Sequence, residues 1–459
     1  MSQTNNQASK TATLVITTIA SFLTPFMGSS INIALPSIGE EFSMNAILLG
    51  WVATSYLLAA AVFLIPFGRL ADMHGRKKIF TYGMVILTVS SVLSAMSPSV
   101  LVLISLRVLQ AIGGAMIFGT GVAILTSVFP ARERGRALGI NVAAVYLGLS
   151  LGPFLGGLLT QYLGWRSIFW ANVPLSLVTL ALIFWKLKGE WADARGEKFD
   201  FTGSLIYGLA LIAFMYGLAE LPAIWAGWLI LAGVLGIWSF VKWEARVSNP
   251  VFNVGIFRNN MVFAFSNLAA LISYSATFAI TFLLSLYLQQ PRELSPQSAG
   301  LILVVQPILM ALISPFAGWL SDRIEPRIVS SIGMVLTFIG LVLFSFLTGE
   351  TALWFVITGL VIVGLGFGLF SSPNTNAIMS SVSKESYGVA SATLGTMRLI
   401  GQVLSMGIVM LIFAVYIGKV QITPEYYPLF LRSLKIVFTI FAALCFGGIF
   451  ASLSRGKVR

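Results

Sequence analysis

The sequence has 459 residues, of which 57% are hydrophobic and only 10% are charged, and its formal net charge is +12. Water-soluble proteins have an apolar fraction of about 45–50%, so this composition excludes a soluble globular protein. The apolar residues come in long blocks, and several blocks approach or exceed the roughly 18–20 residues that cross a bilayer as a helix. They predict a polytopic helical membrane protein.

The first apolar block begins close to the N-terminus. A cleaved signal peptide would have a basic start and a short apolar core. Here Lys10 is the only basic residue before the block, which continues to Pro36. We therefore expect the block to remain as the first transmembrane helix. Charged and Pro/Gly-rich breaks then predict fourteen spans in all, near residues 12–36, 48–68, 79–97, 100–128, 137–162, 167–185, 202–220, 223–241, 260–288, 298–320, 328–347, 352–377, 388–417 and 432–453.

The basic residues predict the orientation of these spans. An even number of spans places both termini on one side of the membrane. Of the 28 lysines and arginines, 21 fall on that side, five fall on the other, and Arg107 and Arg398 lie within spans. Such an excess is typical of the cytoplasmic side. We expect a multi-pass protein of the cell membrane with cytoplasmic termini, and no nucleic-acid partner is needed to explain the net charge.

Two loops share a pattern of charge. Residues 68–78 read GRLADMHGRKK and residues 318–327 read GWLSDRIEPR, so both match G-x-L-x-D. Both follow the second helix of a six-helix group, and parallel repeats of this kind occur in secondary transporters. The predicted units are a six-helix bundle at 1–186, a charged cytoplasmic linker at 187–201, two additional helices within 202–242 and a second six-helix bundle at 243–459.

Further motifs lie on later spans. Residues 106–114 read LRVLQAIGG, residues 148–157 read GLSLGPFLGG and residues 164–169 read GWRSIF. With the loop at 68–78, they resemble the motifs of the major facilitator superfamily, specifically its fourteen-helix drug:proton antiporter branch. The resemblance implies an all-α major facilitator fold, in which two six-helix bundles are related by a pseudo-two-fold axis along the membrane normal and two extra helices lie between them.

The resemblance also implies roles for single residues. The loop would form a cytoplasmic gate in which Asp72 accepts hydrogen bonds from an arginine or a helix N-terminus. The alternative is a basic loop that sets topology and contains an incidental acid. The gating residues are Gly68, Asp72, Gly75, Arg76, Gly318, Asp322 and Arg323. The antiporter motif comprises Gly148, Gly152, Pro153, Gly156 and Gly157, which also suits close helix packing and a bend.

Charged groups within the spans bear on the substrate. An arginine inside a span costs about 2.5–3.5 kcal/mol on insertion scales, so Arg107 and Arg398 each need a cavity or a partner; snorkelling is the alternative for Arg107. Met27 stands where the family commonly has aspartate, and all 16 acidic residues lie at span ends or in loops. We expect neutral, zwitterionic or anionic amphiphiles to be preferred over cations. Proton coupling would run through peripheral acids such as Asp72 or Glu133, or be absent. Arg107, Glu133 and Arg398 are the candidates for a proton or charge network.

Polar residues deep in the spans are candidates for the cavity lining. Each is equally suited to a hydrogen bond between helices. They are Asn32, Gln110, Asn141, Tyr146, Asn267, Tyr274, Gln306, Asn374, Asn376 and Gln402.

The chain lacks the residues of several other classes of protein. It has one histidine and one cysteine, and no P-loop motif, so we expect no metal, no cofactor and no enzymatic activity. The expected partners are a small amphipathic substrate, membrane lipid and, in a coupled transporter, protons; the expected state is a monomer. The leading hypothesis is multidrug-type efflux by alternating access. The alternatives are a facilitative or lipid/anionic-amphiphile transporter without proton coupling, and a non-transporting sensor on the same fold.

Overall fold

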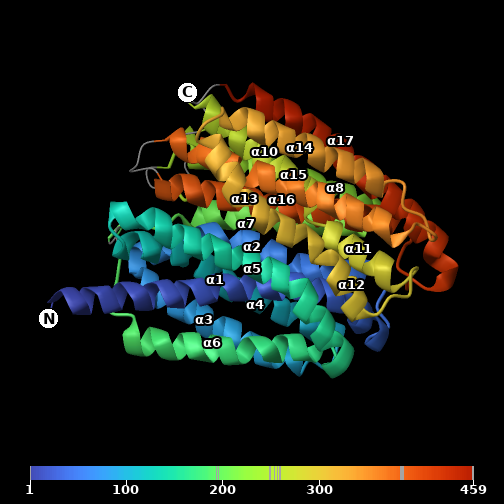
Figure 1. Ribbon diagram of the computed structural model, residues 1–459, viewed down its shortest axis with the longest axis horizontal. Coiled ribbons are helices and arrows are strands. Elements are labelled where there is room, and N and C mark those ends of the chain that lie inside the picture. Colours follow the sequence, from blue (N-terminus) through green and yellow to red (C-terminus); the bar gives the residue numbers. More distant parts are fainter. Residues whose placement is uncertain are drawn as a thin grey trace.

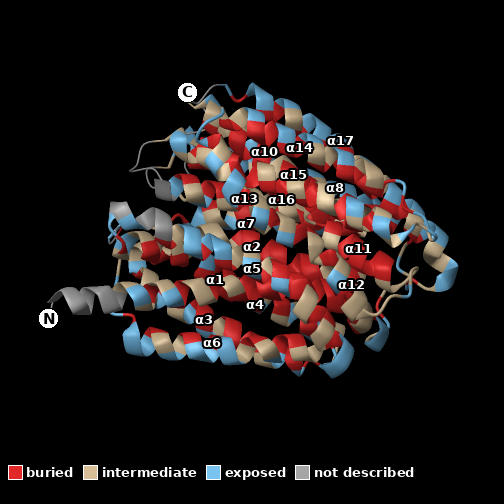
Figure 2. Ribbon diagram, in the orientation of Figure 1, coloured by how far each residue is buried: buried red, intermediate tan, exposed pale blue. Residues whose placement is uncertain are grey.

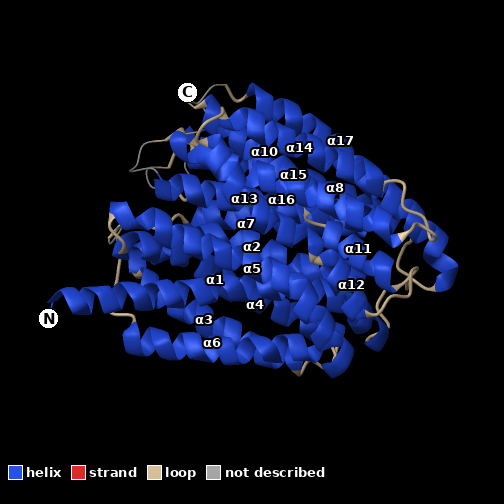
Figure 3. Cartoon of the chain, in the orientation of Figure 1, coloured by secondary structure: helices blue, strands red, loops and turns tan. Residues whose placement is uncertain are grey.

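The computed structural model describes residues 2–192, 194, 196–247, 250–252, 254–255, 257, 260–382 and 387–456. This part of the chain is helical, with loops between the helices and no strand (Figure 3). Fourteen segments within it are long and apolar enough to cross a membrane, which confirms the predicted number of spans.

Both termini lie at the same end of the helix assembly (Figure 1). We call this the terminal end and the opposite one the far end. Because successive spans alternate in direction, the loops of the chain are divided between these two ends.

The first group of helices fills the lower part of Figure 1. In it, α1 packs against α5, α6 and α4, while α3 packs against α4 and α6, and α2 packs against α4. The helices are α1 (Ser2–Glu41), α2 (Ala46–His74), α3 (Arg76–Ala95), α4 (Val100–Val128), α5 (Ala131–Leu163) and α6 (Arg166–Lys186).

The last group of helices fills the upper part. Two of its spans are interrupted: α10 and α11 together form one span, and α12 and α13 form the next. The elements are α10 (Met261–Thr277), α11 (Ile280–Gln289), α12 (Pro296–Leu303), α13 (Val305–Ser321), α14 (Pro326–Phe344), α15 (Leu353–Ser380), α16 (Tyr387–Tyr416), the 3₁₀ turn η2 (Pro424–Tyr426) and α17 (Tyr427–Ser454).

The two additional spans, α7 (Phe201–Glu220) and α8 (Ile224–Glu244), form a hairpin that contacts both groups. The hydroxyl of Tyr207 on α7 donates a 3.1 Å hydrogen bond to the carbonyl of Ala61 on α2. On the other side, Gly407 of α16 leaves room for Met215 of α7. The hairpin therefore covers the line along which α2 and α16 meet.

Polar residues define where several helices begin. Asn45 caps α2 by accepting a 2.9 Å bond from the backbone amide of Leu48, and Asp200 caps α7 in the same way. Such caps satisfy amides that have no partner inside the helix. Buried residues concentrate where helices face each other, and exposed ones lie on the perimeter (Figure 2). Many exposed residues there are large and apolar, which suits a surface that meets lipid.

Candidate functional site

At the far end, helices of the two groups are hydrogen-bonded to each other. The Ser285 hydroxyl on α11 donates a 2.7 Å bond to the backbone carbonyl of Asn32 on α1. Gln289 of the same helix donates to the carbonyl of Ile33 at 2.9 Å. These bonds join the groups at the end away from the termini.

The glycine motif at 148–157 lets α5 lie directly against the α1 backbone. A Cβ atom on Gly148 would come within 2.5 Å of an α1 carbonyl, and one on Gly156 would lie 2.9 Å from the Cα of Ser30. The Ser30 hydroxyl also donates a 3.0 Å bond to the carbonyl of Gly152. Small residues are needed wherever two helix backbones approach this closely.

The end of the same motif contacts the other group. A Cβ atom on Gly157 would lie 2.6 Å from the carbonyl oxygen of Pro296, where α12 begins. Gly300 of α12 in turn lies against the carbonyl of Pro153. Two of the predicted antiporter residues therefore lie where the helix groups meet, and the others lie inside the first group.

The GWRSIF motif joins two helices of the first group at the far end. The indole Nε1 of Trp165 donates a 2.7 Å bond to Glu41, the last residue of α1. Arg166 forms an ion pair with the same carboxylate at 2.7 Å. The motif thus fixes the end of α1 to the start of α6.

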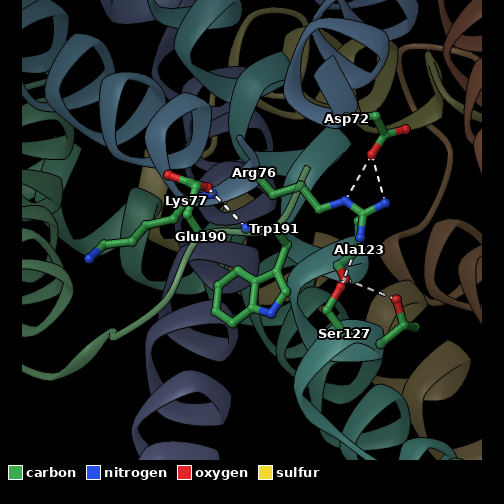
Figure 4. A network of polar contacts seen from close by, with 8 residues as sticks. Asp72, Arg76, Lys77, Ala123, Ser127, Glu190 and Trp191 are labelled. Carbon is green, nitrogen blue, oxygen red and sulfur yellow. Dashed lines mark hydrogen bonds and ion pairs between the residues drawn. The ribbon is translucent and has the colours of Figure 1, made fainter. Parts of the chain in front are cut away.

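The charged loop at 68–78 joins α2 to α3 at the terminal end. Asp72 accepts a 2.8 Å bond from the Nε of Arg76 and forms an ion pair with it at 2.7 Å (Figure 4). Arg76 also donates to the Ser127 hydroxyl on α4 at 2.8 Å. Gly68 lies against α4 as well: a Cβ atom added to Gly119 of α4 would lie 3.4 Å from the Cα of Gly68. The arginine partner expected for Asp72 is found, and it comes from the same loop.

The segment between α6 and α7, at 187–200, packs directly on this loop. The backbone amide of Arg76 donates a 2.8 Å bond to the carbonyl of Trp191. The amide of Ala194 donates to the carbonyl of Asp72 at 2.9 Å. Two main-chain bonds therefore attach the predicted linker to the predicted gating loop.

The carboxylate of Glu190, in the same linker, also binds the loop. Its Oε1 accepts a 2.8 Å bond from the amide of Lys77, in the first turn of α3, where a carboxylate is favoured (Figure 4). Gly75 has φ of +118°, a conformation that favours glycine, and any Cβ there would collide with Glu190. Arg69 and Glu197 form a further ion pair between loop and linker. The only hint of this docking in the sequence is the alternation of acids and bases in the linker.

The second copy of the loop pattern lies at the terminal end of α13. Asp322 accepts a 3.3 Å bond from the amide of Asn376 on α15. The guanidinium of Arg323 lies 4.1 Å from the ring centre of Trp319, and Gly318 lies one residue before that tryptophan. The repeat is therefore present at the same end of both groups, with different partners.

Arg107 lies deep inside the first group and has both hydrogen-bond and aromatic partners. Its Nη1 donates a 2.5 Å bond to Gln110, and its Nε donates to the carbonyl of Val52 at 3.3 Å. Its guanidinium lies 4.4 Å from the ring centre of Tyr56, a cation–π distance. The side-chain Nε2 of Gln110 in turn donates a 2.8 Å bond to the Ser91 hydroxyl on α3. The side chain of Arg107 is only 1% exposed, so it does not snorkel to the surface.

Arg398 lies where the two groups face each other, and only part of its hydrogen-bonding capacity is used. Its Nη2 donates a 3.0 Å bond to Thr375, and its guanidinium lies 5.6 Å from the ring centre of Tyr274. Its Nε has no hydrogen-bond partner in the described chain. Next to it, the hydroxyls of Tyr146 on α5 and Ser371 on α15 lie 3.3 Å apart and so connect the first group to the last.

The remaining polar candidates differ in their surroundings. Asn141 donates to the Ser21 hydroxyl on α1 at 2.8 Å, and Asn267 bonds within its own helix. Gln306 packs against Gly364 on α15. The Oδ1 of Asn32 is buried without a partner in the described chain, and it lies beside the far-end contact between the groups.

The three residues predicted as a charge network do not contact one another in the described structure. Arg107 is bonded to Gln110 and Arg398 to Thr375. Glu133, in the first turn of α5, forms an ion pair of 2.8 Å with Lys10 of α1. Each charge therefore has its own local partner.

Sequence reasoning missed Arg455, which counted only as a basic residue beside a terminus. It is fully buried, and it donates to Asn374 at 2.9 Å and to the Ser452 hydroxyl at 2.6 Å. Burial lowers the pKa of Arg455 to about 10, still far above neutrality, so the guanidinium is charged at pH 7. Asn374, a predicted cavity residue, therefore anchors α17 to α15.

Taken together, these features define a fourteen-span membrane protein whose two helix groups meet around partly exposed polar side chains. No cluster of three or more metal-binding side chains occurs in the described residues. The family model of the Major Facilitator Superfamily matches residues 17–406 and 266–457. The chain belongs to this superfamily, which confirms the predicted family and fold class.

Similar proteins agree with this assignment. The chain is 31% identical to the riboflavin transporter RibZ of Clostridioides difficile (strain 630), over 95% of each chain. It is also 31% identical to the multidrug resistance protein Stp of Mycobacterium tuberculosis (strain CDC 1551 / Oshkosh), over 88% of this chain and 76% of the relative. A bacterial homologue of the human lysosomal transporter Spinster, in an inward-facing and unoccupied conformation, has the same fold, with a TM-score of 0.68 at 17% identity over 97% of each chain.

Proposed function

We propose that this chain exports small amphipathic molecules across the plasma membrane by alternating access. The observation that carries the proposal is the polar centre between the groups, where Tyr146 of α5 meets Ser371 of α15 beside Arg398. A substrate held there contacts both groups, so its binding depends on how they are arranged. The similarity to a multidrug resistance protein supports outward transport.

In this proposal, 1–186 and 243–459 are the two bundles that rock about the centre. The units 187–201 and 202–242 are the linker and the extra hairpin, and the protein works as a monomer. The terminal end faces the cytoplasm, because most lysines and arginines lie there. The loops around Asp72 and Asp322 form the cytoplasmic gate.

Orientation is tested by labelling single cysteines in intact cells with a membrane-impermeant maleimide. Ser43→Cys and Glu350→Cys are exposed at the far end, and both should label from outside. Lys188→Cys and Arg246→Cys are exposed at the terminal end, and they should label only after permeabilisation. Native Cys445 is fully buried, so the parent protein provides the background. The opposite pattern would reverse the direction of every step proposed.

Gating is tested with Asp72→Asn in everted vesicles that accumulate a fluorescent amphiphile. The substitution removes an ion pair worth about 1.5–3 kcal/mol, and we expect accumulation to fall at least tenfold while expression is kept. Glu350→Gln, an exposed carboxylate at the far end, is the matched control and should transport normally. Parental rates in Asp72→Asn would remove the loop from the mechanism.

A second candidate function is transport without proton coupling. The buried Met27 places a thioether where a membrane-embedded carboxylate would sit. In addition, the chain is similar over nearly its whole length to a riboflavin transporter, and not only to multidrug proteins. Riboflavin uptake into proteoliposomes, with and without an imposed pH gradient, separates the two candidates. Riboflavin uptake that is unchanged by the gradient supports the uncoupled mechanism, and uptake driven by the gradient supports antiport. Absence of uptake under both conditions supports a sensor.

A further inference from the structure

We propose that Arg398 forms, with Tyr274 and Thr375, a subsite for the anionic group of the transported molecule, so that the substrates are anionic amphiphiles. This inference rests on the proposed transport function and gives it a substrate class.

The position of Arg398 gives a ligand access to it. The side chains of Arg398, Tyr274, Tyr146 and Thr375 are all partly exposed, although all four lie within spans. They come from α16, α10, α5 and α15, so both helix groups contribute. Three residues before Arg398, Gly395 approaches Leu64 of α2, which places this part of α16 at the contact between the groups.

The electrostatics of Arg398 favour an anion. No carboxylate of the described chain pairs with it, and the one side-chain hydrogen bond that it donates there goes to the neutral Thr375. A guanidinium inside the membrane is costly when its charge is not compensated. Its planar donors match the geometry of a carboxylate, sulfonate or phosphate, and such bonds are strong in a low-dielectric site. A bound anion would supply both the missing charge and an acceptor for the guanidinium.

The surroundings suit the apolar part of the same ligand. The ring of Tyr274 packs edge-on against Phe367, with their centres 5.1 Å apart. The hydroxyls of Tyr146 and Ser371 provide neutral polar groups nearby. A flat aromatic body can therefore lie on the tyrosines while its acidic group reaches Arg398. A permanent cation at this position would be repelled by the same guanidinium.

The test uses two fluorophores that differ by one charged group. 1-Anilinonaphthalene-8-sulfonate carries a sulfonate on the scaffold of neutral N-phenyl-1-naphthylamine. Their affinities are measured on protein in phosphatidylcholine nanodiscs, with empty nanodiscs as the baseline, and their accumulation is measured in proteoliposomes. The variants are Arg398→Met, Arg398→Lys and the control Arg432→Met, which removes an exposed arginine near the far end.

We expect the wild-type protein to bind the sulfonate at least tenfold more tightly than the neutral compound. Arg398→Met should bind the two compounds about equally. Arg398→Lys should retain a smaller preference for the sulfonate, and Arg432→Met should retain the full wild-type preference. An Arg398→Met variant that retains the wild-type ratio overturns the proposal, as does a wild-type protein that prefers the neutral compound or the cation ethidium.

The results distinguish failure of the anionic subsite from failure of the proposed transport function. Transport of the neutral compound without a sulfonate preference would refute the anionic subsite and leave export standing. Binding of the sulfonate that depends on Arg398, with no accumulation of either compound, would support the subsite and refute transport. Loss of sulfonate affinity when phosphatidylglycerol replaces part of the phosphatidylcholine would assign the guanidinium to a lipid headgroup and overturn the substrate class.

Discussion

Arg107 and Arg398 are both arginines within spans, yet their surroundings differ completely. Arg107 is enclosed by one helix group and bonded to Gln110 and to the carbonyl of Val52. Arg398 lies between two groups, partly exposed, and one of its nitrogens is without a partner in the described chain. The sequence presents the two residues as equivalent, and only the partners distinguish them.

The different surroundings of Arg107 and Arg398 indicate two different roles for a charged side chain in a membrane. A buried guanidinium that is bonded to neighbouring helices and stacked on an aromatic ring stabilises the packing of the helices that supply these partners. A partly satisfied one retains binding capacity for a ligand. The difference therefore predicts that variants of Arg107 lose stability, whereas variants of Arg398 lose substrate selectivity.

The largest expected effect is that of Arg107→Met. It removes two hydrogen bonds from a charged donor and leaves the side-chain oxygen of Gln110 buried without that donor, at a cost of about 3 kcal/mol or more. We expect a clear fall in the melting temperature in detergent and a low yield of monodisperse protein. Arg398→Met, measured alongside, should melt close to the wild type. Equal losses in both variants would remove the distinction.

Arg455→Met should have the next largest effect. Its guanidinium is fully buried and bonded to Asn374 and Ser452, but it lies at the end of α17, where water can replace some of the lost bonds. We expect about 2 kcal/mol of destabilisation, measured by the same melting assay. Arg246→Met, an exposed arginine at the same end, is the control. A variant as stable as that control would show that the cluster contributes nothing.

Gln110→Leu tests the acceptor side of the Arg107 network. The substitution leaves Arg107 without its shortest bond and Ser91 without a donor, and we expect a loss of about 1–2 kcal/mol. Gln402→Leu provides a matched comparison, because the side chain of that glutamine makes no hydrogen bond in the described chain, and the substitution should be neutral. If both leucine variants melt alike, Gln110 is not needed to hold the arginine.

The smallest expected effect is that of Thr375→Val. It removes the one hydroxyl that bonds Arg398 while keeping the shape of the side chain. Because the guanidinium is already partly exposed, we expect a change in stability below about 0.5 kcal/mol. Affinity for the naphthalene sulfonate should fall only slightly, since the subsite loses the Thr375 hydroxyl but keeps the guanidinium of Arg398. A loss as large as that of Arg107→Met would mean that Arg398 is a structural residue.

Much of the helical framework could be predicted from the chain. The fourteen spans follow from block length, and the paired loop patterns at Asp72 and Asp322 both follow even-numbered spans, at the same end of the two groups. The packing glycines were also recognisable, because small residues at 148–157 suit only a close helix contact. It was less predictable that the side chains of Asn374 and Asn141, both deep in spans, would be hydrogen-bonded to neighbouring helices.

The sequence by itself determined the class of protein, the number of spans and the family, because hydrophobic block length and local motifs are properties of contiguous residues. Only the tertiary structure decided which polar groups are satisfied. The partners of Arg107 come from α2 and from its own helix, the docking of Glu190 brings residues more than a hundred positions apart together, and Tyr146 meets Ser371 across the two groups. Hydrogen-bond satisfaction depends on helices that are distant in the chain, and so it is fixed only when they pack.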